Sequence, residues 1–218
     1  MILKIKGDIV SNDMKDIYEW FSYDCTTPGD VLTALEEMPK GDRLQVKINS
    51  GGGDVFAGQE IYSTLRGRND VDIEVEGLAA SAASVIAMAG KSTISPVGML
   101  MIHDVSASYI SGNHAQLSKQ AETLKAWDEA LASAYVEKTG KSKEEIIQMM
   151  DAETWITADK AVELGFIDAI SQAGEPVITN SIGNLKVTDE MIKKYEAKKA
   201  DTEKEKNELL KDLDKFGA

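Results

Sequence analysis

The spacing of apolar residues predicts short strands that alternate with helices along most of the chain. The stretches LQVKI (44–48) and VDIEVE (71–76) alternate apolar with polar residues, as half-buried strands do. The predicted strands are 2–5, 44–48, 71–76, 92–94, 99–102 and 166–170, and the predicted helices are 28–38, 58–65, 85–89, 113–138, 144–150 and 157–165. Because strands that alternate with helices pair in parallel through helical crossovers, the pattern predicts an α/β fold.

A glycine run follows the strand at 44–48. Asn49 and Ser50 lead into three consecutive glycines, Gly51 to Gly53. Such a run allows positive φ and lets the main chain approach a ligand closely. A phosphate cradle is one interpretation, but the run lacks the spacing of the known nucleotide-binding loops. The other interpretations are an amide-lined rim for an oxyanion or extended peptide, and an ordinary tight turn between a strand and a helix.

The stretch Gly77 to Ser84 (GLAASAAS) joins strand 71–76 to an apolar helix and places Ser81 at the turn. A helix that begins directly behind a serine offers unpaired amide groups and the positive end of its dipole. The small neighbouring residues leave room for a substrate carbonyl group. The alternative interpretation is a helix rich in serine and alanine that packs closely against its neighbours.

A serine hydroxyl needs a base before it becomes a good nucleophile, and the chain has only two histidines. His103 follows strand 99–102 directly, just as Ser81 follows strand 71–76. Reactive groups gather at the carboxyl ends of parallel strands, so these two side chains and the glycine run are expected to meet. His114 lies at the polar start of a helix and is interpreted as a surface residue. Cys25, in a polar loop, has no histidine near it in sequence and is interpreted as a bystander thiol.

The composition argues against several classes of binding partner and site. The formal net charge of −13 argues against non-specific binding to nucleic acid and against attraction to anionic membranes. The single cysteine excludes an internal disulfide and an all-cysteine metal site, and it fits a reducing compartment. No segment is long and apolar enough to span a bilayer, and the N-terminus lacks the apolar region of a secretory signal. We therefore expect a cytoplasmic protein.

The chain is predicted to divide into a domain at 1–171, a linker at 172–185 and a charged tail at 186–218. The linker contains glycine, proline, asparagine and serine, and the tail carries nine lysines and nine acidic residues. The tail is therefore neutral, and the acidic excess lies in the domain. Its pattern is typical of a solvated single helix or weak coiled coil, or of a frayed segment with no role.

Four motifs, taken together, resemble those of the Clp peptidase family. In chain order they are INSGGG (48–53), GLAAS (77–81), MLMIH (99–103) and ETWITADKAVELGFID (153–168). The resemblance covers roughly residues 1 to 170 and is strongest to the Clp-related head-maturation proteases of tailed phages and prophages. It implies a Clp/crotonase-like spiral of ββα units in which the long helix at 113–138 projects as a handle.

The resemblance implies a catalytic triad. Its residues would be Ser81 as nucleophile, His103 as general base and acid, and Glu153 as the acid, with Asp151 as the alternative acid. Glu153 is a departure, because the family has aspartate there, but a glutamate can fill the role with a longer arm.

The resemblance also implies an oxyanion hole formed by the main-chain amides of Gly52 and Ala82. The family usually has proline at the position of Gly51 and a methionine-like residue at that of Ala82. The shape of the pocket is therefore expected to differ from that of the family, whereas the chemistry is expected to be the same.

The function implied is that of a serine endopeptidase that uses neither a metal nor a cofactor. The subgroup implies cleavage of capsid or scaffold proteins during prohead assembly, in the bacterial host cytosol or in association with the prohead. Handle helices pack ring against ring in this family, so we expect a homo-oligomer in the form of a ring or double ring. The expected substrate is a protein, with neither nucleic acid nor membrane as a partner.

Three other functions are alternatives to a head-maturation peptidase. The first is a degradative Clp-type peptidase that works with an ATPase unfoldase. The second is an acyl-CoA hydratase or isomerase, since those enzymes share the spiral fold and its glycine-rich loops but use carboxylates and need a nucleotide pocket. The third is a capsid-assembly scaffold without catalysis. The neutral tail lends support to the third, and the full set of serine, histidine and acid counts against it.

Overall fold

The computed structural model describes residues 1–108, 110–172 and 204. Residues Met1–Gln172 form one compact unit. The linker and tail predicted from the sequence lie, apart from Gln172 and Lys204, outside the described residues. Within the described part of the chain, no helix is both long and apolar enough to cross a membrane.

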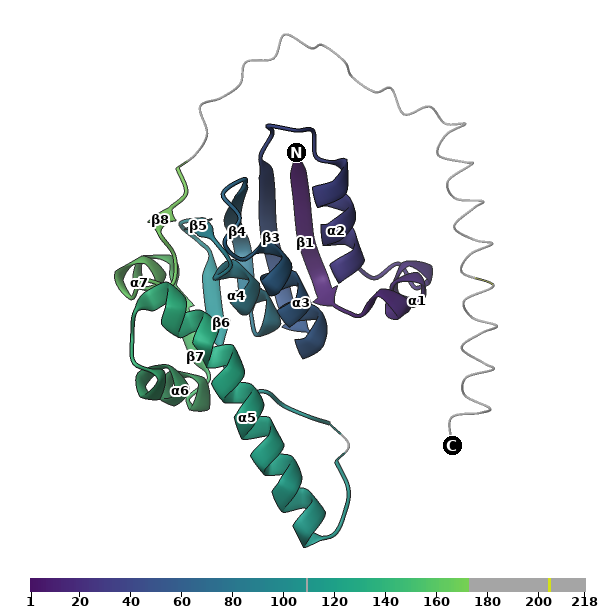
Figure 1. The fold of residues 1–218 in the computed structure, drawn as a ribbon, viewed down its shortest axis with the longest axis vertical. Coiled ribbons are helices and arrows are strands. Elements are labelled where there is room, and N and C mark those ends of the chain that lie inside the picture. The colour runs from purple at the N-terminus through teal and green to yellow at the C-terminus, as the bar shows by residue number, and fades with distance from the viewer. Residues whose placement is uncertain (109, 173–203, 205–218) are drawn as a thin grey trace. The chain divides into compact units, whose positions relative to one another are not determined.

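In the described residues, eight strands form one sheet in the order β2-β1-β3-β4-β5-β8, with β6 beside β4 and β7 beside β6 (Figure 1). The strands are β1 (Ile2–Ile9), β2 (Cys25–Thr26), β3 (Leu44–Gly53), β4 (Val71–Ala80), β5 (Lys91–Ile94), β6 (Met99–Ile102), β7 (Thr154–Thr157) and β8 (Ala169–Ile170). Only β6 and β7 pair in the antiparallel sense among these strands. The parallel α/β architecture predicted from the alternation is therefore confirmed.

The helices connect these strands and cover the sheet. They are η1 (Asn12–Met14), α1 (Lys15–Trp20), α2 (Pro28–Glu37), α3 (Val55–Leu65), α4 (Ala82–Ala87), α5 (His114–Thr139), α6 (Lys143–Asp151) and α7 (Ala158–Glu163). Helix α3 packs against both α2 and α4, and α4 lies on β3 and β4 (Figure 1). Every residue of α4 is buried, so this helix forms the core directly behind the end of β4.

Several predictions about element boundaries are wrong, among them the ends of β1 and β4, which continue to Ile9 and Ala80 instead of ending at 5 and 76. The glycine run does not form a turn after a short strand, because β3 continues through it and Gly53 pairs with Ile9 of β1. A Cβ atom on Gly53 would lie 2.2 Å from the carbonyl oxygen of Ile9, so only glycine lets the two strands approach this closely. Cys25 lies in β2 rather than in a loop. The last strand covers only 169–170 instead of 166–170, because the preceding residues form the turn that closes α7, in which the amide of Ile167 donates to the carbonyl oxygen of Ala161 at 3.1 Å.

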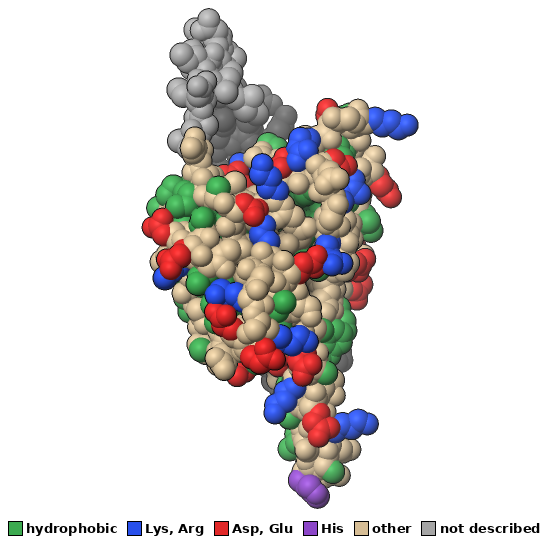
Figure 2. Space-filling view, turned by 60° about the vertical axis from the view of Figure 1, so that its left-hand side comes forward, with side chains coloured by type: hydrophobic (Ala, Val, Ile, Leu, Met, Phe, Trp, Pro, Cys, Tyr) green, Lys and Arg blue, Asp and Glu red, His purple; other side chains and the backbone are tan. Residues whose placement is uncertain are grey.

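Helix α5 changes character along its length. Its first half is exposed and projects from the body as an arm (Figure 1 and Figure 2). Its second half packs on α4 and α6, and it buries Ala132 and Tyr135. This arrangement matches the handle helix predicted from the resemblance. On the face that Figure 2 shows, basic and acidic side chains are interspersed over the body, so the acidic excess does not gather in one patch there.

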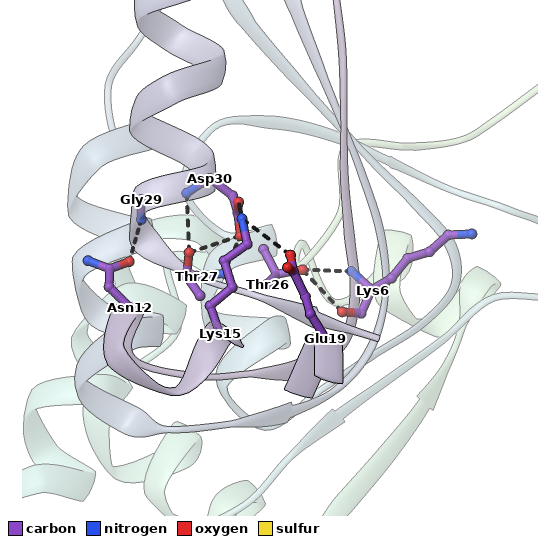
Figure 3. Close-up of polar contacts among 8 residues, drawn as sticks. All are labelled: Lys6, Asn12, Lys15, Glu19, Thr26, Thr27, Gly29 and Asp30. Carbon is purple, nitrogen blue, oxygen red and sulfur yellow. Dashed lines mark hydrogen bonds and ion pairs between the residues drawn. The ribbon is translucent and has the colours of Figure 1, made fainter. Parts of the chain in front are cut away.

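The segments β2, η1 and α1, which join β1 to α2, were not predicted; α1 has only six residues and buries none of them. Polar contacts hold them instead, in a group that we call the polar corner (Figure 3). Its members are Lys6, Asn12, Lys15, Glu19, Thr26, Thr27, Gly29 and Asp30. Within it, Lys15 pairs with Asp30, which also closes the capping box of α2 with Thr27.

Candidate active site

The register of β4 on β6 brings Ser81 and His103 together. The pairing runs from Leu78 opposite Met99 to Ala80 opposite Met101, where β4 ends one residue before the end of β6. The amide of Ser81 then donates to the carbonyl oxygen of Met101 at 2.9 Å. Because His103 lies two residues beyond Met101, both side chains emerge at the carboxyl end of the same parallel pair, as the sequence predicts for such a sheet.

The Ser81 turn is strained, and its hydroxyl faces the imidazole. Ser81 has φ 54° and ψ −127°, a conformation that residues other than glycine rarely adopt. Its Oγ lies 2.7 Å from Nε2 of His103. In the tautomer that carries its proton on Nδ1, the His103 ring accepts a hydrogen bond from the Ser81 hydroxyl through Nε2. This is the relation between a nucleophile and its general base.

A small cavity opens in front of this pair. It has a volume of about 60 Å³, and its lining includes Ser81, Ala82, His103 and Gly53. Leu131 and Tyr135 of α5 also line it. The cavity therefore joins the glycine run, the serine turn and the histidine loop, the three segments that were predicted to meet.

The two predicted oxyanion-hole residues lie on either side of the Ser81 turn. A Cβ atom on Gly52 would lie 2.7 Å from Cβ of Ser81 and 3.0 Å from the amide nitrogen of Ala82, so the glycine main chain packs directly against the turn. The Gly52 amide donates to Oγ of Ser50 at 3.1 Å. Its use as an oxyanion donor requires that this bond be exchanged. Among the described residues, the Ala82 amide has no recorded acceptor.

The two predicted acids lie apart from the Ser81–His103 pair in their recorded contacts. Glu153 is exposed, has φ 47° and accepts a hydrogen bond from the indole nitrogen of Trp155 at 3.3 Å. Asp151 ends α6, and its carboxylate is one of the causes that raise the pKa of Asp104. Within the described part of the chain, His103 makes no recorded hydrogen bond to either predicted acid.

A third carboxylate, Asp128 of α5, was not predicted. Asp128 is only 9% exposed, and its Oδ1 accepts a hydrogen bond from the amide of Val105 at 2.6 Å. Val105 lies two residues after His103, so Asp128 fixes the loop that carries the imidazole. One signal in the sequence could have found it. Asp128 stands between Leu124 and Leu131 on the apolar face of a predicted helix, where a charged residue needs a specific partner.

Among the described residues, Asp104, Asp128 and Asp151 form no recorded ion pair with a lysine or arginine. Burial, the negative charge of Asp128 and the contact with Asp151 together raise the pKa of Asp104 to about 6. Burial also raises the pKa of Asp128. The Val105 amide and the imidazole of His103 act in the opposite direction on Asp128, whereas the charge of Asp151 adds to the effect of burial. The imidazole of His103 thus acts to lower the pKa of Asp128.

Comparison with known proteins gives a family and a set of relatives. The profile of the family described as Clp protease matches residues 26–174, more than half of the chain. An ATP-dependent Clp protease proteolytic subunit 1 from Streptomyces avermitilis is 36% identical over 138 residues, which cover 62% of this chain and 63% of that protein.

Two further relatives are of the same kind. A proteolytic subunit 1 from Chlamydia abortus is 33% identical over 64% of this chain and 75% of its own length. A proteolytic subunit 2 from Corynebacterium diphtheriae is 32% identical over 69% of this chain and 76% of its own length. Ser81 and His103 both lie within the span of the family profile.

Proposed function

Because the chain belongs to the Clp protease family, we propose that it is a peptidase subunit in which Ser81 attacks the peptide bond and His103 transfers the proton. The observation that carries the proposal is the 2.7 Å distance between Oγ of Ser81 and Nε2 of His103 at the carboxyl end of two paired strands. The Clp/crotonase-like α/β fold predicted from the sequence is confirmed, and the predicted class, serine-type endopeptidase, is the class of this family.

In the proposed reaction, Oγ of Ser81 bonds to the carbonyl carbon while its proton moves to Nε2 of His103. The carbonyl oxygen becomes an oxyanion, which the Ala82 amide and an amide of the glycine run stabilise. The imidazolium then protonates the leaving amine as the peptide bond breaks. Water attacks the resulting acyl-serine ester, again with His103 as the base, and the serine is regenerated.

A carboxylate is needed to orient the imidazole and to support its positive charge. We propose Asp128 for this role, because it is buried and its carboxylate holds the amide of Val105, two residues after His103, in the loop that carries the imidazole. Glu153, which occupies the position of the family's aspartate, and Asp151 stay as the alternatives predicted from the sequence. Asp151 is the last residue of α6 and Glu153 lies two residues after it, so either of them would require a shift of the end of this helix on assembly.

The names of the relatives favour a degradative role. They are proteolytic subunits of ATP-dependent Clp proteases from bacteria. By this likeness, we propose that the chain assembles into a ring and receives unfolded protein from an ATPase unfoldase in the bacterial cytosol. Maturation of phage capsid or scaffold protein stays a prediction that rests on the Glu153-Thr154-Trp155 motif.

The test of the chemistry is labelling by a fluorophosphonate probe together with hydrolysis of a fluorogenic peptide. We expect Ser81→Ala to lose both activities while it keeps the oligomeric state of the natural chain. Ser63→Ala, a change at an exposed serine of α3, is the matched control and is expected to react normally. Persistent labelling of Ser81→Ala would rule out Ser81 as the nucleophile.

A second experiment separates the two biological roles. Degradation of a folded protein only in the presence of an unfoldase and ATP would support the degradative role. Defined cleavage of a phage scaffold or capsid protein without ATP would instead support head maturation.

A further inference from the structure

Behind the proposed nucleophile lies a buried chain of hydroxyl groups. Oγ of Ser84 donates to the carbonyl oxygen of Ser81 at 2.6 Å, and it also lies 2.7 Å from the hydroxyl of Tyr135. Ser84 is fully buried and Tyr135 is 2% exposed. A polar pair in such a place needs complete hydrogen bonding, because an unmade bond there carries a large penalty.

The direction of these bonds follows from the groups themselves. A serine hydroxyl has one proton, and a carbonyl oxygen can only accept, so the Ser84 proton is used on Ser81. The Tyr135 hydroxyl must then be the donor to Oγ of Ser84. Burial raises the pKa of Tyr135, so its hydroxyl keeps its proton throughout the pH range in which a peptidase works.

We infer that Ser84 and Tyr135 are positioning residues for Ser81, and the inference rests on the function proposed above. The Ser81 carbonyl also accepts from the amides of Ser84 and Val85, at 2.9 and 3.3 Å. The hydroxyl chain adds a third donor and fixes the carbonyl from the side of α5. Because Ser81 is held at a φ of 54°, a backbone conformation that serine rarely adopts, constraints on its carbonyl keep Oγ directed at His103.

A structural explanation alone accounts less well for the pair. Serines in helices often donate to a carbonyl three or four residues earlier, so that bond by itself would mean little. Here Oγ of Ser84 also accepts a hydrogen bond from the hydroxyl of Tyr135 on another helix, although the other residues of α4 are all apolar. An alanine and a phenylalanine would fill this space without polar groups, since Tyr135 packs its ring edge against Phe166 at 5.9 Å. Replacing both partners of a buried hydrogen bond by apolar groups is often nearly neutral for stability.

The test uses the double variant Ser84→Ala/Tyr135→Phe in the full chain. We expect its melting temperature to lie close to that of the natural chain and its rate of fluorophosphonate labelling at Ser81 to fall about tenfold or more, since small misplacements of a nucleophile have large effects on rate. For a fluorogenic peptide, kcat should fall while KM and the midpoint of the pH profile stay unchanged. Tyr62→Phe is the matched control, because it removes another tyrosine hydroxyl that contacts α5, through Glu137 at 3.4 Å.

The outcomes separate this inference from the proposed function. If the natural chain labels at Ser81 and the folded double variant labels within twofold of it, the pair is packing only and the inference is rejected alone. If the natural chain does not label at Ser81, the proposed function fails and the inference fails with it. If the double variant does not fold, Tyr135→Phe alone is decisive, because it keeps the ring and removes only the hydroxyl. A severalfold loss of rate in that variant supports the inference, and an unchanged rate overturns it.

Discussion

The polar corner and the carboxylates near His103 are both clusters of acidic and polar groups, but their charges are arranged in opposite ways. In the corner, burial acts to raise the pKa of Asp30, yet the hydrogen bonds from Lys15 and Thr27 outweigh it and the pKa is lowered. Beside His103, burial and neighbouring acids raise the pKa of Asp104 to about 6. The corner satisfies its charges, whereas the other cluster keeps like charges together.

This difference separates a region that holds the fold from a region that does chemistry. The corner links α1, which buries none of its residues, to the rest of the fold through hydrogen bonds and ion pairs. The region around His103 combines unfavourable carboxylates, a serine at positive φ and a glycine packed against it. Groups with raised or lowered pKa values and strained backbone gather at functional sites because their arrangement serves reactivity at the expense of stability.

The largest effect is expected from removing the acid that supports His103. Asp128→Asn keeps the size of the side chain but loses its charge, so kcat for a fluorogenic peptide should fall by roughly a hundredfold to ten-thousandfold. Asp151→Asn and Glu153→Gln are the matched variants, and each should change kcat much less. A full rate in Asp128→Asn with a large loss in Glu153→Gln would return the role to the position of the family's aspartate.

Crowding the glycine run should have the next largest effect. Gly52→Ala places a Cβ atom 2.7 Å from the carbonyl oxygen of Ala80 and from Cβ of Ser81, so the serine turn must move and labelling should fall by about a hundredfold. Gly41→Ala is the control, because Gly41 has a similar φ of 91° but nothing within 4 Å. Equal labelling rates in the two variants would mean that the close packing at Gly52 has no part in the reaction.

Breaking the polar corner should affect stability instead of activity. Lys15→Met leaves the half-buried Asp30 without its cation. We expect the free energy of unfolding, measured in urea, to fall by about 1 kcal/mol. Labelling of Ser81 should not change. The loss should be greatest at neutral pH and should shrink as the pH falls through the lowered pKa of Asp30, since protonation removes the charge that Lys15 supports. Lys40→Met, at an exposed position, is the control. A loss of labelling would contradict the division between the two regions.

The smallest effect on stability is expected from replacing Asp104. Here the change should raise the stability at neutral pH, whereas Lys15→Met lowers it. The folded chain binds a proton at Asp104 up to a pH of about 6, whereas a free aspartate releases it near ~4. Stability is therefore lost as the pH rises between these values. Asp104→Asn should remove this loss and be slightly more stable than the natural chain at pH 7, with little difference at pH 4. Urea unfolding at the two pH values measures it, and a variant that is less stable at pH 7 would contradict the unfavourable placement of this carboxylate.

The sequence predicted those parts of the fold whose signals are local and periodic. The strand at 99–102 and the helices that became α2, α5 and α6 have clear apolar spacing or caps, and each was found to within one residue at either end. Segment 12–26 was missed because polar contacts with distant residues hold it. Strand β3 was predicted too short because its glycines pair with β1, which no local pattern reveals.

The residues of the candidate site likewise divide into those that the sequence predicted and those that it did not. The positions of Ser81 and His103 could be predicted because each directly follows a strand and parallel strands align their ends. Asp128 and the pair Ser84 and Tyr135 were missed, since their partners come from segments far away in sequence. Their only local signal is a polar group among apolar neighbours on a helix.

The most direct test of the Ser81–His103 pair is mass spectrometry of the chain after reaction with a fluorophosphonate, with the modified residue located by peptide fragmentation. We expect one adduct in the natural chain, on Ser81. In His103→Asn, the rate of adduct formation should be lower by about a thousandfold. An adduct on a different residue, or an equally fast reaction at Ser81 in His103→Asn, would contradict it.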